Sequence, residues 1–183
     1  VYPIAEPPLI DAFARAGIPM SEDPARIDLV VASYDRTFDY AKLQIAFDAI
    51  WFHRRAALIG TNPDRFCPFP GGMGQPDCAA IVAAIEACTG TRAETVLGKP
   101  NPQMARTALR GLDSDLERAV MVGDRLMTDI RLATTAGMAS AMPLTGESTR
   151  EEAAALPPQE RPTYVLERVD HLLPRDIWDQ RGW

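Results

Sequence analysis

The sequence predicts an α/β fold with parallel sheets, and the order of its apolar segments is the main reason. Apolar runs of strand length occupy residues 1–5, 28–34 and 56–60. Between them, residues 9–14 and 40–52 place apolar side chains at the three- and four-residue spacing of an amphipathic helix. Strands that alternate with helices in this way are typical of α/β units whose strands run parallel. A second series of the same kind follows, so we expect two domains.

The elements of the first half each have a local cause. The first helix keeps its apolar side chains on one face and stops at a glycine: Leu9, Ile10, Phe13 and Ala14, then Gly17. The run at 28–34, with β-branched Val30 and Val31 at its centre, indicates a buried strand. The run at 56–60 ends at Thr61-Asn62-Pro63-Asp64, a turn-forming cluster. We expect a loop at 65–76, which is rich in Pro and Gly, and then a helix over 77–88. Asp77 is the expected N-cap of that helix, and Gly90 lies just past its end.

The second half repeats the alternation of strand and helix. Residues 95–97 lead into Gly98-Lys99-Pro100, and Asn101 with Pro102 is expected to begin a helix. The remaining expected elements, in order, are a strand at 116–122, a helix at 129–136 closed by Gly137, a strand at 138–144, a capping box at Ser148-Thr149-Arg150-Glu151, and final elements at 164–166 and 169–173. We therefore predict domains of residues 1–97 and 98–183.

Composition limits the function classes. The 183 residues are 46% hydrophobic and 24% charged with a net charge of −6, which is ordinary for a soluble globular protein. No Lys/Arg-rich stretch is present, so we expect no nucleic-acid partner. The longest apolar runs are too short to span a bilayer and no signal peptide is visible, so we expect no membrane partner. The three cysteines lack metal-type spacing, which favours reduced thiols and a cytoplasmic location.

The strongest candidate site is the segment from Gly123 to Asp129. An apolar strand runs into Gly123-Asp124, and Asp129 follows five residues after Asp124, at the start of the next helix. In open α/β sheets, ligands bind outside the carboxyl ends of the strands. A site of oxygen ligands with few carboxylates suits Mg²⁺, which keeps several waters. We therefore expect Asp124 and Asp129 to form a magnesium site; the alternative is that Asp124 caps a turn and Asp129 caps a helix.

A single lysine is the second candidate. Lys99 lies between Gly98 and Pro100, directly before a helix, which would hold its cation in one place. A loop lysine taken alone is usually solvated, so its meaning depends on the acidic segment about two dozen residues later.

Four motifs together resemble the NagD-like, para-nitrophenyl phosphatase branch of the haloacid dehalogenase (HAD) superfamily. In order they are Thr61-Asn62-Pro63-Asp64, Gly98-Lys99-Pro100-x-Pro102, Val122-Gly123-Asp124-Arg125-Leu126-x-Thr128-Asp129-Ile130 and Leu144-Thr145-Gly146. The resemblance covers nearly the whole chain. It implies a Rossmann-like core, of which residues 98–183 form the C-terminal half, and an α/β cap formed by residues 1–97.

The resemblance also implies an activity and a role for each residue. The expected enzyme is a Mg²⁺-dependent phosphatase that hydrolyses small phosphomonoesters through an aspartyl-phosphate intermediate. Asp124 would ligate the metal, Asp129 would support the metal site, and Lys99 would neutralise the nucleophile and the phosphoryl group. Thr61, Asn62 and Asp64 would lie on the substrate side. The partner would be a small phosphorylated metabolite, and caps of this type often pair, which would give a homodimer.

The family's nucleophile motif, Asp-x-Asp after a hydrophobic strand, has no convincing match. Asp113-Ser114-Asp115 has the spacing, but a helical stretch precedes it, whereas a nucleophile needs a strand end. The chain also opens inside an apolar run without Met. We therefore expect the nucleophile to lie on a preceding segment of a longer protein, and this chain alone to be inactive.

Two other readings stay open. The first is a catalytically inactive family member that binds a phosphorylated ligand or a protein partner. The second is a receiver-like signalling domain, which also gathers Asp, Thr and Lys around Mg²⁺. In receivers the lysine follows the acidic residues along the chain, whereas Lys99 precedes Asp124 and Asp129.

Overall fold

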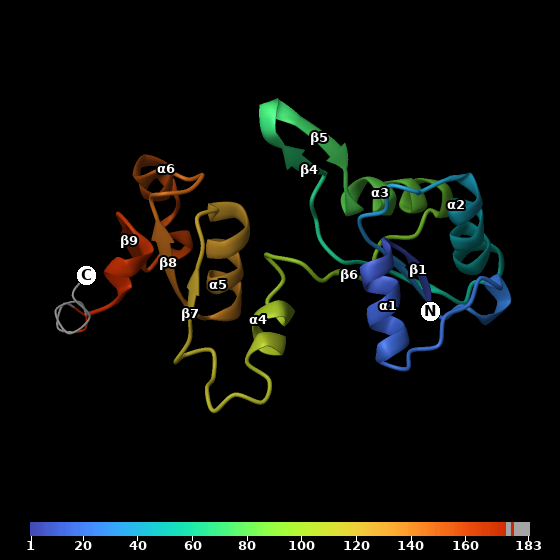
Figure 1. The fold of residues 1–183 in the computed structure, drawn as a ribbon, viewed down its shortest axis with the longest axis horizontal. Coiled ribbons are helices and arrows are strands. Elements are labelled where there is room, and N and C mark those ends of the chain that lie inside the picture. The colour runs from blue at the N-terminus through green and yellow to red at the C-terminus, as the bar shows by residue number, and fades with distance from the viewer. Residues whose placement is uncertain (175–176, 178–183) are drawn as a thin grey trace. The chain divides into compact units, whose positions relative to one another are not determined.

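The structure, a computed structural model, describes residues 1–174 and 177. The chain divides into two compact units, Val1–Gly98 and Lys99–Trp183. Both are built from parallel strands joined through helices, which confirms the predicted α/β class (Figure 1). The roles of cap and core for these parts of the chain stay a prediction.

The first unit has a sheet of four parallel strands in the order β1-β2-β3-β6. The strands are β1 (Tyr2–Ile4), β2 (Leu29–Ala32), β3 (Ala57–Gly60) and β6 (Thr95–Val96). The helices between them are α1 (Pro7–Arg15), α2 (Tyr40–Phe47) with a π-helical turn at Asp48–Phe52, and α3 (Cys78–Thr89). Alternate strand side chains, among them Ile4, Val30 and Leu58, are fully buried in one apolar cluster with α2 and α3. Because all four strands are parallel, their carboxyl ends meet at one edge of the sheet.

The predicted loop at 65–76 is wrong. This segment is an antiparallel hairpin of β4 (Phe66–Phe69) and β5 (Met73–Pro76) (Figure 1). Its turn contains Gly71 and Gly72, whose φ angles of 81° and 75° a glycine adopts without steric cost. The Pro and Gly residues that indicated a loop therefore form the turn and the ends of two short strands.

The predicted ends of helix α3, which follows the hairpin, are confirmed. Asp77 accepts a hydrogen bond from the backbone N–H of Cys78, and Gly90 ends the helix with a φ of 70°. Asp77 thereby satisfies one of the backbone donors that a helix start leaves without a partner.

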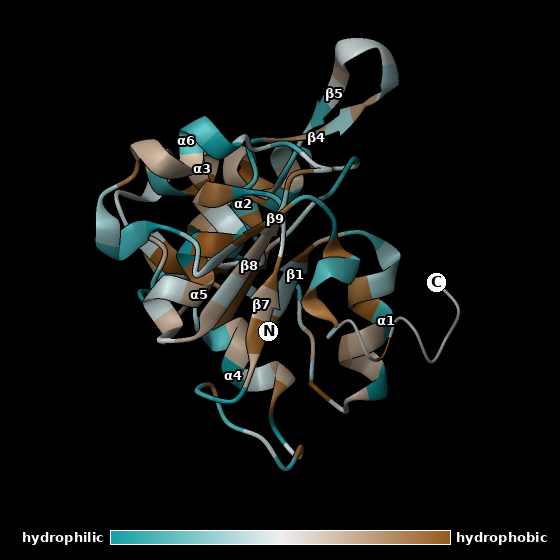
Figure 2. Cartoon of the chain, turned by 90° about the vertical axis from the view of Figure 1, so that its left-hand side faces the viewer, coloured by the Kyte–Doolittle hydropathy of each residue, from teal (hydrophilic) through white to brown (hydrophobic). Residues whose placement is uncertain are grey.

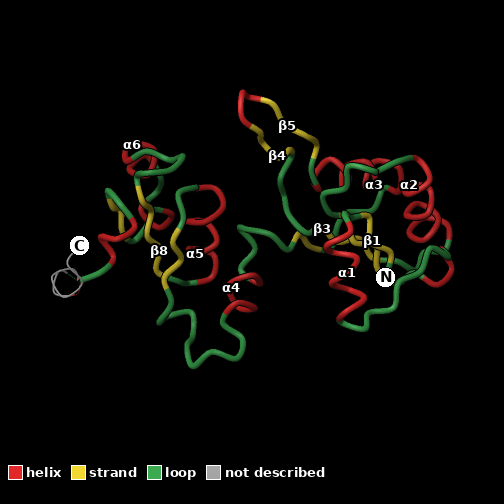
Figure 3. Tube along the Cα trace, in the orientation of Figure 1, coloured by secondary structure: helices red, strands yellow, loops and turns green. Residues whose placement is uncertain are grey.

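The second unit has a parallel sheet in the order β7-β8-β9. Its strands are β7 (Val120–Val122), β8 (Ala139–Pro143) and β9 (Tyr164–Leu166). Its helices are α4 (Gln103–Ala108), α5 (Arg131–Ala136), preceded by a π-helical turn at Leu126–Ile130, and α6 (Arg150–Ala155), part of which is hydrophilic (Figure 2). The segment between α4 and β7 has no helix or strand (Figure 3). Ile130, Met142 and Ala153 form the centre of this unit's apolar core.

Several element boundaries differ from the predicted ones. β7 is shorter than the predicted strand at 116–122, because the residues before Val120 form a turn. Asp129 lies in the π-helical turn rather than at the start of α5. The capping box belongs to Thr149 and Glu152, one residue later than predicted: Thr149 Oγ1 accepts the Glu152 N–H, and the Glu152 carboxylate accepts the Thr149 N–H. None of the helices that the structure describes is long and apolar enough to cross a membrane.

Candidate active site

The candidate site begins where β7 ends. Gly123 continues the pairing with β8 by one residue, because its N–H donates to the Ala141 carbonyl with an N···O distance of 3.2 Å. Asp124 is therefore the first residue to leave the sheet. Its side chain is half-buried at the carboxyl edge of parallel strands, where α/β proteins hold their ligands.

The Asp124 carboxylate is held by the loop after β8. Its Oδ2 accepts the backbone N–H of Glu147 at 2.8 Å, and its backbone carbonyl accepts the N–H of Ser148 at 3.1 Å. The hydrogen bond from Glu147 is the main reason that the pKa of Asp124 lies below its ordinary value. The positive charges of Arg125 and Lys99 lower this pKa further, while burial opposes the shift. Asp124 is therefore an anion at neutral pH.

Asp129 and Lys99 form an ion pair beside Asp124. Lys99 Nζ lies 2.7 Å from Asp129 Oδ1, and the Asp129 side chain is only 4% exposed. The second oxygen, Oδ2, accepts the backbone N–H of Arg125 at 3.3 Å. The structure thus brings together the three residues that the sequence selected in this half of the chain, Lys99, Asp124 and Asp129.

Two glycines provide the space for the two carboxylates. A Cβ atom on Gly123 would lie 2.3 Å from Asp129 Cγ, and one on Gly146 would lie 2.2 Å from Asp124 Cβ. Contacts this short are forbidden, so neither position can hold a side chain unless an aspartate moves. Neither glycine has a positive φ, so the reason is space and not backbone conformation.

The carboxylates of Asp124 and Asp129 could supply only some of the ligands that a Mg²⁺ ion needs. A carboxylate has about four lone-pair sites, so Asp124 can still offer oxygen to a cation. Both oxygens of Asp129 already accept, one from Lys99 and one from Arg125, which suits support of the site more than direct ligation. Among residues 1–174 and 177, no group of three or more His, Cys, Asp or Glu side chains could hold a metal ion. Because Mg²⁺ often binds through one or two carboxylates with waters and phosphate oxygens, a contribution of one acid is compatible with it.

The three predicted substrate-side residues lie in the other unit, directly after β3. Thr61 Oγ1 donates to Ser33 Oγ at 2.8 Å, and Asn62 Oδ1 accepts the N–H of Asp64 at 2.9 Å. A Cβ on Gly98, the last residue of this unit, would lie 2.8 Å from the Cα of Asn62. Thr61, Asn62 and Asp64 therefore form a tight turn on which the end of the unit packs, and their contact with substrate stays a prediction.

The Asp113-Ser114-Asp115 segment lies in the turn before β7. Both aspartates are exposed, and Asp115 Oδ1 accepts the backbone N–H of Arg118 at 3.0 Å. Asp115 thus stabilises a turn, and neither acid lies at the end of a strand, where a nucleophile is expected.

Sequence reasoning missed the contributions of Arg125, Glu147 and Ser148. Arg125 Nε lies 2.7 Å from Glu147 Oε2, and Ser148 Oγ accepts the N–H of Leu126 at 3.3 Å. The Leu144-Thr145-Gly146 motif was the available signal, because it ends the strand next to β7 and its loop must emerge at the same edge.

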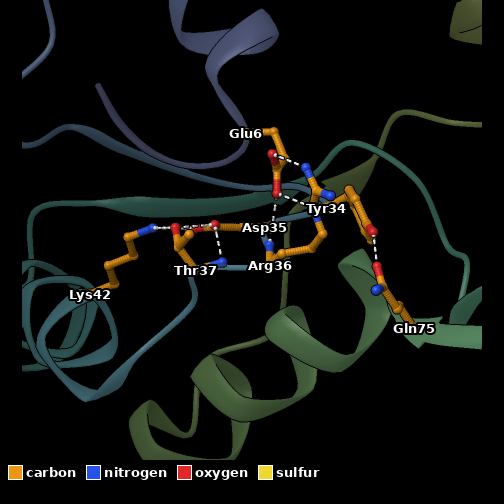
Figure 4. Close-up of polar contacts among 7 residues, drawn as sticks. All are labelled: Glu6, Tyr34, Asp35, Arg36, Thr37, Lys42 and Gln75. Atoms are coloured by element: carbon orange, nitrogen blue, oxygen red, sulfur yellow. Dashed lines mark hydrogen bonds and ion pairs between the residues drawn. The ribbon is translucent and has the colours of Figure 1, made fainter.

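A second polar cluster, also missed, occupies the carboxyl edge of the sheet in the first unit (Figure 4). Asp35 is buried there. Its Oδ1 accepts both the N–H and the hydroxyl of Thr37, and its Oδ2 lies 2.5 Å from Lys42 Nζ. Glu6 binds Arg36 through both carboxylate oxygens at 2.9 Å. Every one of these charged groups has a partner within the cluster.

Known proteins that resemble this chain are phosphatases or HAD-hydrolase-like proteins by name. Residues 96–172 match the family model for HAD-hydrolase-like proteins. The chain is 33% identical over 178 residues to a dihydroxyacetone phosphatase from Corynebacterium glutamicum, covering 97% of this chain and 61% of that protein. It is 31% identical to the ribonucleotide monophosphatase NagD of Escherichia coli, covering 92% of this chain and 63% of that protein.

A solved structure gives the same result for the fold. The 4-nitrophenylphosphatase from Thermotoga maritima superimposes with a TM-score of 0.81 at 34% sequence identity, covering 93% of this chain and 63% of that chain. The present chain spans about three fifths of the length of the two curated relatives.

Proposed function

Because the chain belongs to the haloacid dehalogenase superfamily, in its NagD-like branch, we propose that it supplies part of the active site of a Mg²⁺-dependent phosphatase for small phosphomonoesters. The observation that carries the proposal is the grouping of Lys99, Asp124 and Asp129 at the carboxyl edge of one sheet. Relatives that act on dihydroxyacetone phosphate, nucleotides or 4-nitrophenyl phosphate support the substrate class, a small phosphorylated metabolite.

The physical problem in such a reaction is charge repulsion. Two like unit charges about 4 Å apart repel by about 4 kcal/mol at an effective dielectric constant near 20. A carboxylate nucleophile that approaches a phosphate dianion meets this repulsion twice. Asp124 would hold the magnesium ion, and the ion, when bound, supplies positive charge next to the phosphoryl oxygens.

Lys99 would supply the second positive charge. The Lys99 side chain is 40% exposed, so it can reach a substrate, while the buried carboxylate of Asp129 fixes its position. Asp129 is thus a positioning residue in this proposal, because it acts through Lys99 and through the backbone of Arg125. The cation and the ammonium act most strongly where negative charge is spread over the transferring oxygens.

The proposed chemistry has two steps. A carboxylate attacks phosphorus and the ester P–O bond breaks, and the leaving oxygen takes a proton from a general acid, which gives the alcohol and an acyl phosphate. Water then attacks phosphorus, returns one proton to that group, and releases phosphate and the free carboxylate. Asp113 and Asp115 lie outside the site, and Asp124 and Asp129 are engaged as described. We therefore propose that residues 1–183 alone do not complete the reaction, and that Thr61, Asn62 and Asp64 contact the leaving group. Three free cysteines suit a reducing compartment, which supports a cytoplasmic location.

The test is hydrolysis of para-nitrophenyl phosphate by the parent protein with any native sequence that flanks residues 1–183. Asp124→Ala should lower turnover at least about a hundredfold, equivalent to about 2.7 kcal/mol in the activation barrier. Asp113→Ala, the same change at an exposed aspartate outside the site, should leave turnover unchanged. Near-normal turnover of Asp124→Ala at saturating Mg²⁺ would contradict the ligand assignment. A parent protein that binds phosphate esters without hydrolysing them would favour the inactive, ligand-binding alternative.

A further inference from the structure

The loop after β8 binds the residues that follow β7 through hydrogen bonds and an ion pair. We call residues Gly146, Glu147 and Ser148 the 146–148 loop. Glu147 donates its N–H to Asp124 Oδ2, and Ser148 donates its N–H to the Asp124 carbonyl. Ser148 Oγ accepts the N–H of Leu126, and the Glu147 carboxylate pairs with Arg125. The three consecutive residues 124–126 are thus each held by this loop.

The two contacts to Asp124 come from the backbone of the 146–148 loop. Backbone donors are fixed by the path of the chain and have no rotamer freedom to lose. Gly146 allows this path, because any Cβ at that position would overlap the Asp124 side chain. The orientation of the Asp124 carboxylate is therefore restricted by the close approach of Gly146 and by the hydrogen bond from Glu147 to Oδ2.

We infer that the 146–148 loop is the positioning element for the metal-binding carboxylate of Asp124. It holds Oδ2 with the N–H of Glu147 and thereby presents the carboxylate in one orientation to a divalent cation. This inference rests on the proposed function, since it assigns to the loop a role at the same metal site. A preorganised ligand binds a cation more tightly because the ordering is complete before binding.

The alternative is that the loop only joins the ends of two strands. In that case, disturbing Gly146 would lower the stability of the fold but leave the intrinsic affinity for a cation unchanged. A change in metal affinity would therefore support the positioning role, whereas a change in fold stability alone would support the role of a simple connection.

The experiment measures binding of Mn²⁺ to the folded parent protein by electron paramagnetic resonance of the free ion. Mn²⁺ shares the preference of Mg²⁺ for oxygen ligands. Gly146→Ala should raise the dissociation constant for Mn²⁺ at least tenfold, because the added methyl group displaces the Asp124 carboxylate. Gly137→Ala is the matched control: Gly137 has a φ of 72° and no atom near its missing Cβ. That variant should lower the melting temperature and leave the dissociation constant unchanged.

The outcomes separate the inference from the proposed function. If Gly146→Ala binds Mn²⁺ as tightly as the wild type, the positioning role is wrong while the phosphatase proposal stands. If Gly146→Ala does not fold, Ser148→Ala decides, since it removes only the hydroxyl that accepts the Leu126 N–H. An increase in the dissociation constant of about threefold supports the inference, and no change overturns it. If Asp124→Asn binds Mn²⁺ as well as the wild type, the metal assignment itself fails, and the inference fails with it.

Discussion

Among residues 1–174 and 177, two aspartate–lysine pairs with a buried aspartate lie near the carboxyl edge of a parallel sheet, and they differ in how completely their charges are satisfied. Asp35 and Lys42 form the pair in the first unit, and Asp129 and Lys99 form the pair in the second. Asp35 accepts from Lys42 and twice from Thr37, and Lys42 also donates to Thr37. This first network is closed, because each charged atom has its partner inside the cluster (Figure 4).

The second pair is more open. Lys99 is 40% exposed, against 28% for Lys42, and a second carboxylate, Asp124, lies close enough for Lys99 to lower its pKa. Two carboxylates that share one lysine leave negative charge that the chain itself does not fully balance. The comparison teaches that the same two residue types can form a closed network that stabilises the fold in one place and an open one in another, where we propose a site for a cation and a phosphate. The difference lies in the balance of charges, not in the residues themselves.

The largest expected difference concerns Lys42. Lys42→Met keeps the aliphatic stem but leaves the carboxylate of Asp35 buried without its cation. Breaking a buried pair in this way costs about 3 kcal/mol. Native-state hydrogen exchange should show the opening free energy of the β2 and β3 amides falling by this amount. Lys42→Arg, which keeps the charge, is the control and should recover part of the loss.

The corresponding change at Lys99 should cost less stability. Lys99→Met should lower the opening free energy of the β7 and β8 amides by about 1 kcal/mol, because water can reach an ion pair whose lysine is this exposed. The same exchange experiment measures it. Equal losses for Lys42→Met and Lys99→Met would break the comparison, since both pairs would then act mainly on the fold.

The smallest effect is a pH dependence at Asp35. Burial raises the pKa of Asp35, but hydrogen bonds from Lys42 and Thr37 outweigh it, so the pKa in the folded protein lies below the ordinary value. The unfolded chain has an aspartate pKa of about 3.9. The ionised group therefore stabilises the fold above that pH, and this contribution is lost as the pH falls through the lower folded-state pKa.

Asp35→Asn should consequently flatten the dependence of the unfolding free energy on pH below about pH 5. Urea unfolding followed by circular dichroism at a series of pH values measures the slope. Asp11→Asn, at an exposed position in α1, should leave the slope as in the wild type. If Asp35→Asn has the same slope as the wild type, protonation of Asp35 does not contribute to the pH dependence of the unfolding free energy.

The sequence predicted those features that depend on local pattern. The alternation of apolar runs predicted the α/β class, and the turn after an apolar strand placed Asp124 at the edge of a sheet. The Gly-Asp-x-x-x-Thr-Asp spacing selected Asp129, and the family motif selected Lys99. The α/β class is confirmed, because it depends on residues that are close in sequence. The structure brings Lys99, Asp124 and Asp129 together, and their roles in a site stay predictions.

The sequence could not predict contacts between residues that lie far apart in the chain and meet only in the folded structure. Nothing in the pattern indicates that Glu147 donates its N–H across to Asp124, 23 residues earlier. No sequence pattern singled out the Asp35–Lys42 pair, because burial of Asp35 follows from the packing of the sheet edge. The β4–β5 hairpin was missed because Pro and Gly are typical of loops, and pairing of two short strands leaves little alternation to detect.

The glycine at position 146 has a consequence for sequence variation. At Gly137, where the constraint is a φ of 72°, asparagine or aspartate can take the place of glycine, since these residues tolerate the left-handed region. At Gly146 the overlap begins at Cβ, an atom that every other amino acid has in the same position. Alanine, serine and tryptophan therefore meet the same obstacle there. A saturation library should show uniform intolerance at 146 and a graded preference at 137.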